Sequence, residues 1–150
     1  MQKLFIREAR IIDAEKIISF QKKMAVETEN MKLENDTIHQ GVHAVFADPH
    51  KGVYYVAEYN NEVIGSLLIT YEWSDWRNSF VWWIQSVYIL PGHRRKGYFK
   101  EMYKHVRETA LQNGVAGLRL YVEKDNTAAQ KTYEALGMTG DHYRMYEWLK

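Results

Sequence analysis

Residues 80–123 combine a strand-like run, a loop rich in glycine and basic residues, a helical repeat and a second strand-like run. The first run, residues 80–90, ends at Pro91, and apolar residues then recur at helical spacing over residues 97–112. The second run covers residues 117–123. Two strands joined through a helix pair in parallel by a right-handed crossover, so this segment requires a sheet with helices packed on it.

The flanking patterns complete the predicted order of elements. They comprise strands at 3–8, 52–59, 62–73 and 142–148, with helices from Asp13, over 35–49 and over 126–136. The turn at 60–62 makes the second and third strands an antiparallel hairpin. We therefore expect one domain over residues 1–150, with an α/β fold, a mixed sheet and the order β-α-α-β-β-β-α-β-α-β.

Composition excludes several classes of function. The chain has 20 basic and 19 acidic residues, so it lacks the overall positive charge of proteins that bind nucleic acid or membranes. It has no cysteine, which excludes disulfides, thiolate nucleophiles and cysteine zinc sites. His39 and His43 are spaced like a metal pair, but no third ligand is evident, and we expect no metal. With no apolar stretch of signal-peptide or membrane-spanning length, we expect a soluble cytoplasmic protein.

The loop "LPGHRRKGYFKEMY", residues 90–103, has the features of an anion site. N–H groups at a helix start lack partners, the helix dipole is positive there, and Gly97 allows close approach of an anion. From these residues alone, a solvated basic turn that binds no anion is an alternative to an anion site. The sequence contains neither G-x-x-x-x-G-K-[ST] nor an early G-x-G-x-x-G, so a diphosphate on a long cofactor fits better than a metal-bound triphosphate.

Two segments resemble motifs of the GNAT N-acetyltransferase superfamily. The first, "VYILPGHRRKGYFKEMYKHV", resembles motif A, V-x-V-x-P-x-x-[QR]-x-x-G-x-[GA], except that Phe99 stands where the family has Gly or Ala. The second, "LYVEKDNTAAQKTYEALGM", resembles motif B, N-x-x-A-x-x-x-Y-x-x-x-G-[FM]. The matching residues are Val87, Ile89, Pro91, Arg94 and Gly97 in the first motif, and Asn126, Ala129, Tyr133, Gly137 and Met138 in the second.

The resemblance implies acetyl-coenzyme A as the cofactor and a GNAT-like fold with splayed parallel strands 4 and 5. N–H groups of residues 95–99 would hold the pyrophosphate, and the main chain of Val87 and Ile89 would pair with the pantetheine arm. We expect the Phe99 ring to turn toward the core, which leaves its N–H group for the cofactor. The implied cofactor-binding residues are Val87, Tyr88, Ile89, Arg94, Arg95, Lys96, Gly97, Tyr98, Phe99 and Asn126.

Tyr133 is the catalytic residue that the resemblance implies, as a general acid for the leaving thiolate. The alternative for such a residue in isolation is a buried structural tyrosine. Asn126 suits both a helix N-cap and a cofactor contact. A general base is not evident, because the strand before motif A, where many family members carry a carboxylate, reads "WWIQS". The remaining candidates are Glu27, Glu29, Glu72 and Glu123, each of which also fits an exposed surface carboxylate.

Aromatic residues cluster between Tyr71 and Trp83, on two neighbouring predicted strands and the connection between them. Residues Trp82 and Trp83 point to opposite faces of their strand, so we expect one of them in the core. The other, with Trp73 or Trp76, fits either an acceptor pocket or a dimer surface. Aromatic walls near carboxylates suit an organic cation or primary amine. We assign substrate binding to Glu27, Glu29, Trp73 and Trp83, and we expect a homodimer.

The sequence thus predicts an N-acetyltransferase that moves an acetyl group directly to a primary amine of a small molecule. Direct transfer is favoured because no cysteine can carry the acetyl group. Two alternatives stay open at this stage: acetylation of a protein N-terminus or lysine, and a non-catalytic coenzyme A-binding regulatory module.

Overall fold

The computed structural model describes residues 3–150, and the chain divides into two compact units at Arg119. The first unit contains a five-stranded sheet with the helices that cover it, and the second, Leu120–Lys150, contains one helix. Within residues 3–150, no helix is both long and apolar enough to span a membrane.

The sheet of the first unit has the strand order β1-β2-β3-β4-β5. Strands β1 to β4 pair antiparallel, and β4 pairs with β5 in parallel, so the predicted mixed sheet is confirmed. The strands are β1 (Leu4–Glu8), β2 (Val53–Tyr59), β3 (Glu62–Ser74), β4 (Ser79–Ile89) and β5 (Gly117–Arg119). The helices are α1 (Ala14–Glu29), α2 (Asn35–Ala47) and α3 (Tyr98–Gln112), with 3-10 turns η1 (Ile11–Asp13) and η2 (Pro91–His93).

The turn between β2 and β3 follows from its two asparagines. Asn60 has a φ of 50° and Asn61 a φ of 64°, the left-handed pair that a two-residue hairpin turn requires. Asparagine tolerates this region better than most residues. The turn therefore sets the register that pairs Tyr59 with Glu62.

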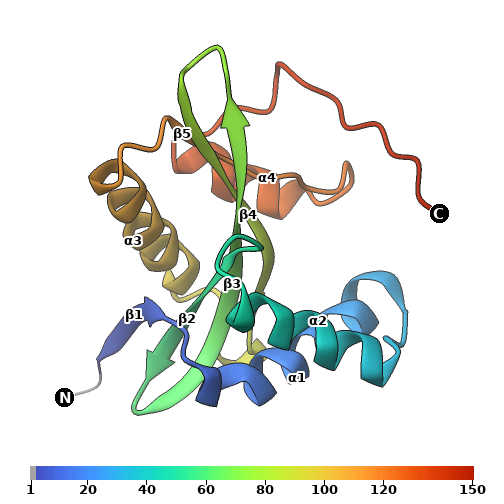
Figure 1. Ribbon diagram of the computed structural model, residues 1–150. Coiled ribbons are helices and arrows are strands. Elements are labelled where there is room, and N and C mark those ends of the chain that lie inside the picture. The colour runs from blue at the N-terminus through green and yellow to red at the C-terminus, as the bar shows by residue number, and fades with distance from the viewer. Residues whose placement is uncertain (1–2) are drawn as a thin grey trace. The chain divides into compact units, whose positions relative to one another are not determined.

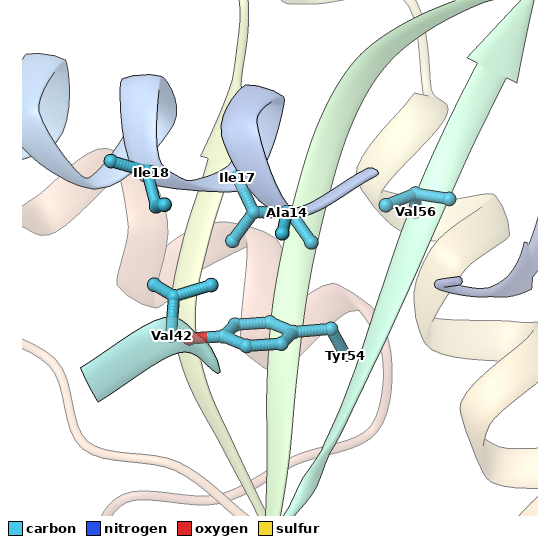
Figure 2. Packing of buried hydrophobic residues seen from close by; sticks show 6 residues of the cluster. All are labelled: Ala14, Ile17, Ile18, Val42, Tyr54 and Val56. Atoms are coloured by element: carbon cyan, nitrogen blue, oxygen red, sulfur yellow. The ribbon is translucent and has the colours of Figure 1, made fainter. Parts of the chain in front are cut away.

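The helices cover both faces of the sheet (Figure 1). On one face, Tyr54 and Val56 of β2 pack against α1 and α2, as Figure 2 shows; the other buried members of this cluster are Ala14, Ile17, Ile18 and Val42. On the opposite face, the ring of Tyr55 packs against His105 of α3. Successive residues of a strand point to opposite faces, so one short strand contributes to both cores.

Asp13 is the N-cap residue of α1, as predicted, but its side chain does not bond the first turn of that helix. Its carboxylate accepts two hydrogen bonds from the Arg7 guanidinium, at 2.8 and 3.0 Å, and one from the N–H of Arg10 at 2.7 Å. The bonds from Arg7, more than any other contact, hold the pKa of Asp13 below its ordinary value. The ionised pair ties β1 to the start of α1, and this prevails over capping because the guanidinium offers a charged donor.

The second unit contains α4 (Thr127–Ala135). Asn126 is its N-cap, and its Oδ1 accepts the N–H of Ala129 at 3.1 Å, as predicted. Two strand predictions are wrong: one predicted strand is absent, and another is shorter than predicted. Residues 142–148 form no strand in this unit, and β5 ends at Arg119 instead of continuing to residue 123. A strand needs a partner for its N–H and C=O groups, and alternating side chains alone do not provide one.

Candidate functional site

The loop between β4 and α3 holds two residues in the left-handed backbone region. Arg95 has a φ of 61°, and Gly97, the residue before α3, has a φ of 81°. A Cβ atom added at Gly97 would meet nothing within 4 Å, so conformation rather than crowding favours glycine there. The first N–H groups of a helix point out of its N-terminus because they have no acceptor in the preceding turn. The first main-chain N–H groups of α3 and the positive end of its dipole therefore point toward this loop.

The basic side chains of this loop differ in their contacts. Arg95 and Lys96 are exposed. Arg94 folds back onto the protein: its Nε donates to the carbonyl oxygen of Ile89 at 2.7 Å, and its Nη2 donates to Oε2 of Glu27 at 2.9 Å. Arg94 is thus bound to the ends of β4 and α1, while Arg95 and Lys96 supply positive charge at the loop surface.

Glu27, Tyr88 and Arg94 form a network that we call the Glu27 clamp. Tyr88 Oη donates to Oε1 of Glu27 at 2.9 Å, and the Arg94 guanidinium lies 5.2 Å from the centre of the Tyr88 ring. Tyr88 is buried and packs on Phe20 of α1. The hydrogen bond from Arg94, followed by that from Tyr88, holds the pKa of Glu27 below its ordinary value. The clamp joins the end of α1 to the loop and is ionised at neutral pH.

The end of β4 has main-chain groups that point away from β3. A bulge interrupts the β3–β4 register opposite Ser66–Leu68, and Ser86 there has a φ of 53°. After this bulge, the N–H of Leu90 donates to the carbonyl oxygen of Ile64 in β3. Because main-chain groups alternate in direction along a strand, those of Ile89 and Val87 face the other side.

The pairing of β4 with β5 stops before this segment. The register joins residues 81–83 of β4 to residues 117–119, and its last pair is Trp83 with Arg119. Strand β4 continues to Ile89. This agrees with the predicted splay of strands 4 and 5. Residues 84–89 therefore form a stretch of strand beyond the parallel ladder, and an extended ligand could add to it as a strand does.

A second ionic network, which we call the Glu72 cluster, lies at the last β4–β5 pair. Trp83 Nε1 donates to Oε1 of Glu72 at 2.8 Å, and Arg119 Nη1 donates to Oε2 at 2.8 Å. The bond from Trp83, and then that from Arg119, hold the pKa of Glu72 below its ordinary value. Beside the cluster, Gln85 Nε2 donates to Oγ1 of Thr70. Glu72, Thr70 and Trp83 share one sheet face by register and alternation.

Sequence reasoning treated Glu72 only as a candidate base and did not single out Arg119. A signal was available, since Arg119 interrupts the apolar run "GLRLYVE", and a charged residue within a strand requires a partner or solvent. The pairing itself was not available, because it joins residues 47 positions apart.

Trp73 and Trp83, which we assigned together to substrate binding, point to opposite faces of the sheet. Trp83 lies on the face of Glu72, whereas Trp73 follows Glu72 directly in β3 and packs on Phe80 with ring centres 5.0 Å apart. Trp82 lies on that same opposite face, against Tyr71. Trp73 is 54% exposed, and Trp83 is half-buried.

Glu29 lies exposed at the C-terminal end of α1, two residues past the Glu27 clamp. A surface pocket of about 590 Å³ lies near this helix end, and its lining residues are Lys22, Val26, Lys32, Leu33, Glu34 and Asn35. No residue that we assigned to the cofactor or the acceptor lines this pocket.

Phe99 is half-buried, and its ring lies 6.5 Å from that of Tyr103 on α3. In the second unit, Asn126 and Tyr133 belong to one helix, with Asn126 exposed and Tyr133 half-buried. Burial raises the pKa of Tyr133 above its ordinary value. Tyr133 therefore keeps its hydroxyl proton across the physiological range of pH.

His39 and His43 both face Glu15, with Nε2 to carboxylate distances of 3.5 and 3.9 Å. In the described part of the chain, residues 3–150, no group of three or more His, Cys, Asp or Glu side chains is arranged to hold a metal ion.

Comparison with known proteins shows which family this chain resembles in sequence and in fold. The model of a family described as acetyltransferase (GNAT) family matches residues 13–138. A crystal structure of a possible acetyltransferase from Clostridium difficile 630 is 41% identical, with a TM-score of 0.90, covering 98% of this chain and 97% of that one. An aminoglycoside N-acetyltransferase in complex with CoA has a TM-score of 0.82 at 17% identity, covering 100% of this chain and 97% of that one, which shows a shared fold.

One curated relative is a thialysine N-epsilon-acetyltransferase from Bos taurus. It is 33% identical over 75 residues, which cover 50% of this chain and 44% of that protein. The matched region therefore spans less than half of that relative's length.

Proposed function

This chain belongs to the acetyltransferase (GNAT) family, and we propose that it transfers the acetyl group of acetyl-coenzyme A to a primary amine of a small molecule. The observation that carries this proposal is the backbone of residues 84–98. It combines a bulged strand that extends past its parallel partner with a loop whose left-handed Arg95 and Gly97 precede α3. The family match at residues 13–138 runs across both units, which supports a single domain over residues 1–150.

The residues of the first unit fit acetyl-coenzyme A. We assign the pyrophosphate to the N–H groups of residues 95–99, with charge from the exposed side chains of Arg95 and Lys96. The main chain of Val87 and the N–H of Ile89 face away from β3 and could pair with an arm that lies along β4, while the carbonyl oxygen of Ile89 already accepts from Arg94 Nε. When bound, acetyl-coenzyme A supplies an activated acetyl thioester.

The chain must supply proton transfers and orientation. A lysine-like amine has a pKa of about 10.4, so its deprotonation at neutral pH costs roughly 4 to 5 kcal/mol. Desolvation near Trp83 would lower the pKa of the amine and so reduce that cost, with water accepting the proton. Tyr133, protonated because burial raises its pKa, is assigned as the proton donor to the leaving sulfur. Asn126 is assigned to the cofactor beside its capping role.

For the acceptor we retain Trp83 and the exposed carboxylate of Glu29, on the α1 side of the first unit. Trp73 faces the other side of the sheet, so its assigned contact with the acceptor requires a second surface. Glu27 acts on the acceptor indirectly in this proposal, because Arg94 and Tyr88 already occupy both of its carboxylate oxygens. A homodimer and a cytoplasmic location also remain predictions of the sequence.

A direct test is the release of free thiol from acetyl-coenzyme A with a panel of amines. We expect turnover with small primary amines at rates above those with peptides that present an N-terminal amine or a lysine. Preference for the peptides would replace the small molecule by a protein acceptor. Binding of coenzyme A without turnover on any amine would instead identify a regulatory binding module.

The Glu27 clamp gives a separate prediction for cofactor affinity. Replacing Glu27 by Gln removes the charge that holds Arg94 but keeps the size of the side chain. We expect the Kd of coenzyme A to rise about 5-fold or less, because the loop loses a partly exposed ion pair that contributes about 1 kcal/mol or less before the cofactor arrives. Isothermal titration measures this directly.

Glu108→Gln is the matched control, since it removes one exposed carboxylate from α3. A double-mutant cycle with Arg94→Gln should show that the Glu27 and Arg94 effects are not additive. Equal affinities in Glu27→Gln and Glu108→Gln would exclude the clamp as a positioning device.

A further inference from the structure

We propose that Gln85 selects primary amines as acceptors, because its side-chain oxygen accepts a hydrogen bond from the N–H group that the acceptor keeps throughout acetyl transfer. Thr70 holds the Gln85 side chain in place for this contact. The inference rests on the proposed function and names the residue that selects the amine.

The place of Gln85 on β4 is the first argument. The proposed cofactor arm runs back along β4 from the loop, past Ile89 and then Val87. Gln85 comes next, two residues or about 7 Å of extended strand beyond Val87. The β4–β5 ladder ends at Trp83, so Gln85 belongs to the stretch of β4 that extends past it. The reacting end of the arm would therefore lie near Gln85.

The direction of the Gln85 side chain is the second argument. Gln85 pairs with Leu68 of β3, and Leu68 packs against the buried cluster formed by β2, α1 and α2. Residues directly opposite each other in antiparallel strands share a face of the sheet. The next residue, Ser86, has a φ of 53° at the bulge, and bulges redirect the side chains beside them. Gln85 thus lies on the α1 side of the sheet, which we assign to the acceptor.

Hydrogen-bonding capacity is the third argument. Gln85 is half-buried, and its Nε2 donates to Oγ1 of Thr70. Within residues 3–150, this is the one hydrogen bond of the Gln85 side chain. A glutamine side chain also has a carbonyl oxygen that accepts hydrogen bonds. The bond to Thr70 therefore fixes the amide and leaves Oε1 for a donor on a ligand.

The reaction determines which amines can use this oxygen. A neutral primary amine has two N–H groups. As its nitrogen bonds to the acetyl carbon and the C–S bond breaks, the sulfur takes the proton that we assign to Tyr133, and one amine proton passes to water. The other proton remains as the N–H of the product amide, so its hydrogen bond to Gln85 can persist. A secondary amine gives an amide without an N–H, and Oε1 then loses its donor.

A primary amine and its N-methyl derivative test this selection. We choose phenethylamine and N-methylphenethylamine, and we measure the ratio of their kcat/KM values by thiol release. Gln85→Met keeps the length of the side chain and removes its polar groups. We expect the ratio to fall about 5-fold, or about 1 kcal/mol, as for the loss of one neutral hydrogen bond. If phenethylamine is not turned over, the fastest primary amine of the panel and its N-methyl derivative replace this pair.

Gln112→Met is the matched control, because it makes the same change at an exposed glutamine that ends α3. It should leave the ratio unchanged. A purely structural link between β3 and β4 predicts that Gln85→Met lowers kcat/KM by the same factor for both amines. Turnover with such an unchanged ratio would overturn the inference and leave the acetyltransferase intact. No thiol release with any amine would reject the proposed function itself.

Thr70 is a positioning residue in this proposal. Thr70→Val keeps the shape of the side chain and removes the acceptor for Gln85 Nε2, so the ratio should fall about 2- to 3-fold. Thr70→Ser keeps the hydroxyl and should restore the wild-type ratio. If Thr70→Ser lowers the ratio as much as Thr70→Val, the methyl group matters and the hydroxyl does not hold Gln85.

Gln85→Glu tests the contact by a different measurement. A carboxylate still accepts from an N–H group, so the preference for the primary amine should remain. Its charge would also stabilise the ammonium form of the bound acceptor and raise the pKa of that amine. We therefore expect the rise of kcat with pH to move to higher pH in Gln85→Glu. An unchanged pH profile would place residue 85 away from the amine and contradict the proposal.

Discussion

Gly97→Glu is expected to abolish measurable binding of coenzyme A while the protein stays folded. The substitution places a carboxylate where the first N–H groups of α3 face the proposed pyrophosphate. Two like charges about 4 Å apart repel by roughly 4 kcal/mol at an effective dielectric constant of 20, which corresponds to about a 1,000-fold increase in Kd. A left-handed φ of 81° adds strain for any residue with a Cβ, of about 1 kcal/mol. Titration calorimetry with coenzyme A measures the loss.

Two variants separate the charge from the other changes. Gly97→Ala has the strain alone, since its Cβ meets nothing within 4 Å, and should raise Kd only a few-fold. Lys96→Ala removes one exposed positive charge and should also cost a few-fold, because an exposed charge contributes about 1 kcal/mol or less. A cooperative thermal melt, lowered by no more than a few degrees in the Gly97 variants, would show that each variant folds. If Gly97→Glu were as mild as Lys96→Ala, the main chain would not form the cradle that we propose.

The order of elements could be predicted from the sequence because it depends on local signals. The hairpin turn depends on Asn60 and Asn61, whose left-handed conformations are a property of the residues themselves. The parallel pair of β4 and β5 follows from chain connectivity, since a helix joins the two strands. The alternation of side chains at residues 142–148 predicted a strand that the structure does not contain, because a strand also requires a partner strand.

Side-chain pairing between distant segments could not be predicted in the same way. The sequence "HRRK" contains three consecutive basic residues that look alike. In the structure, Arg94 binds Glu27, which lies 67 positions earlier in the chain, whereas Arg95 and Lys96 are exposed. Which basic residue folds back depends on where α1 ends relative to β4. That is a property of packing, and neither the motif nor the composition contains it.

The two ionic networks also divide the carboxylates that the sequence left as equal candidates. Glu27 has both oxygens bound by Tyr88 and Arg94 at the end of β4, beside the cofactor loop. Glu72 is held by Trp83 and Arg119 further back along β4, where the parallel pairing ends. Both have lowered pKa values, so both favour charge complementarity over proton abstraction. We therefore propose that the ammonium form of the acceptor loses its proton to water and not to either of these side chains.

Tyr133→Phe is expected to lower kcat by about 100-fold or more with little change in the Kd of coenzyme A. A positioned general acid contributes about 100- to 10,000-fold, and a 100-fold loss corresponds to about 2.7 kcal/mol of barrier. Burial raises the pKa of Tyr133, so its proton is present at every pH below about 10. The wild-type kcat should therefore rise with pH as the amine deprotonates, with no decline below pH 10.

Tyr146→Phe is the matched control, because it makes the same chemical change at a tyrosine that is 90% exposed in the same unit. It should leave kcat and Kd unchanged. The test is most specific when the leaving group is varied, since a proton donor to sulfur matters less as the thiol becomes more acidic. Acetyl thioesters of thiols with low pKa should therefore recover part of the rate in Tyr133→Phe. If the loss is the same for all leaving groups, or if Kd rises in step with the loss of kcat, Tyr133 supports the packing of α4 and does not donate the proton.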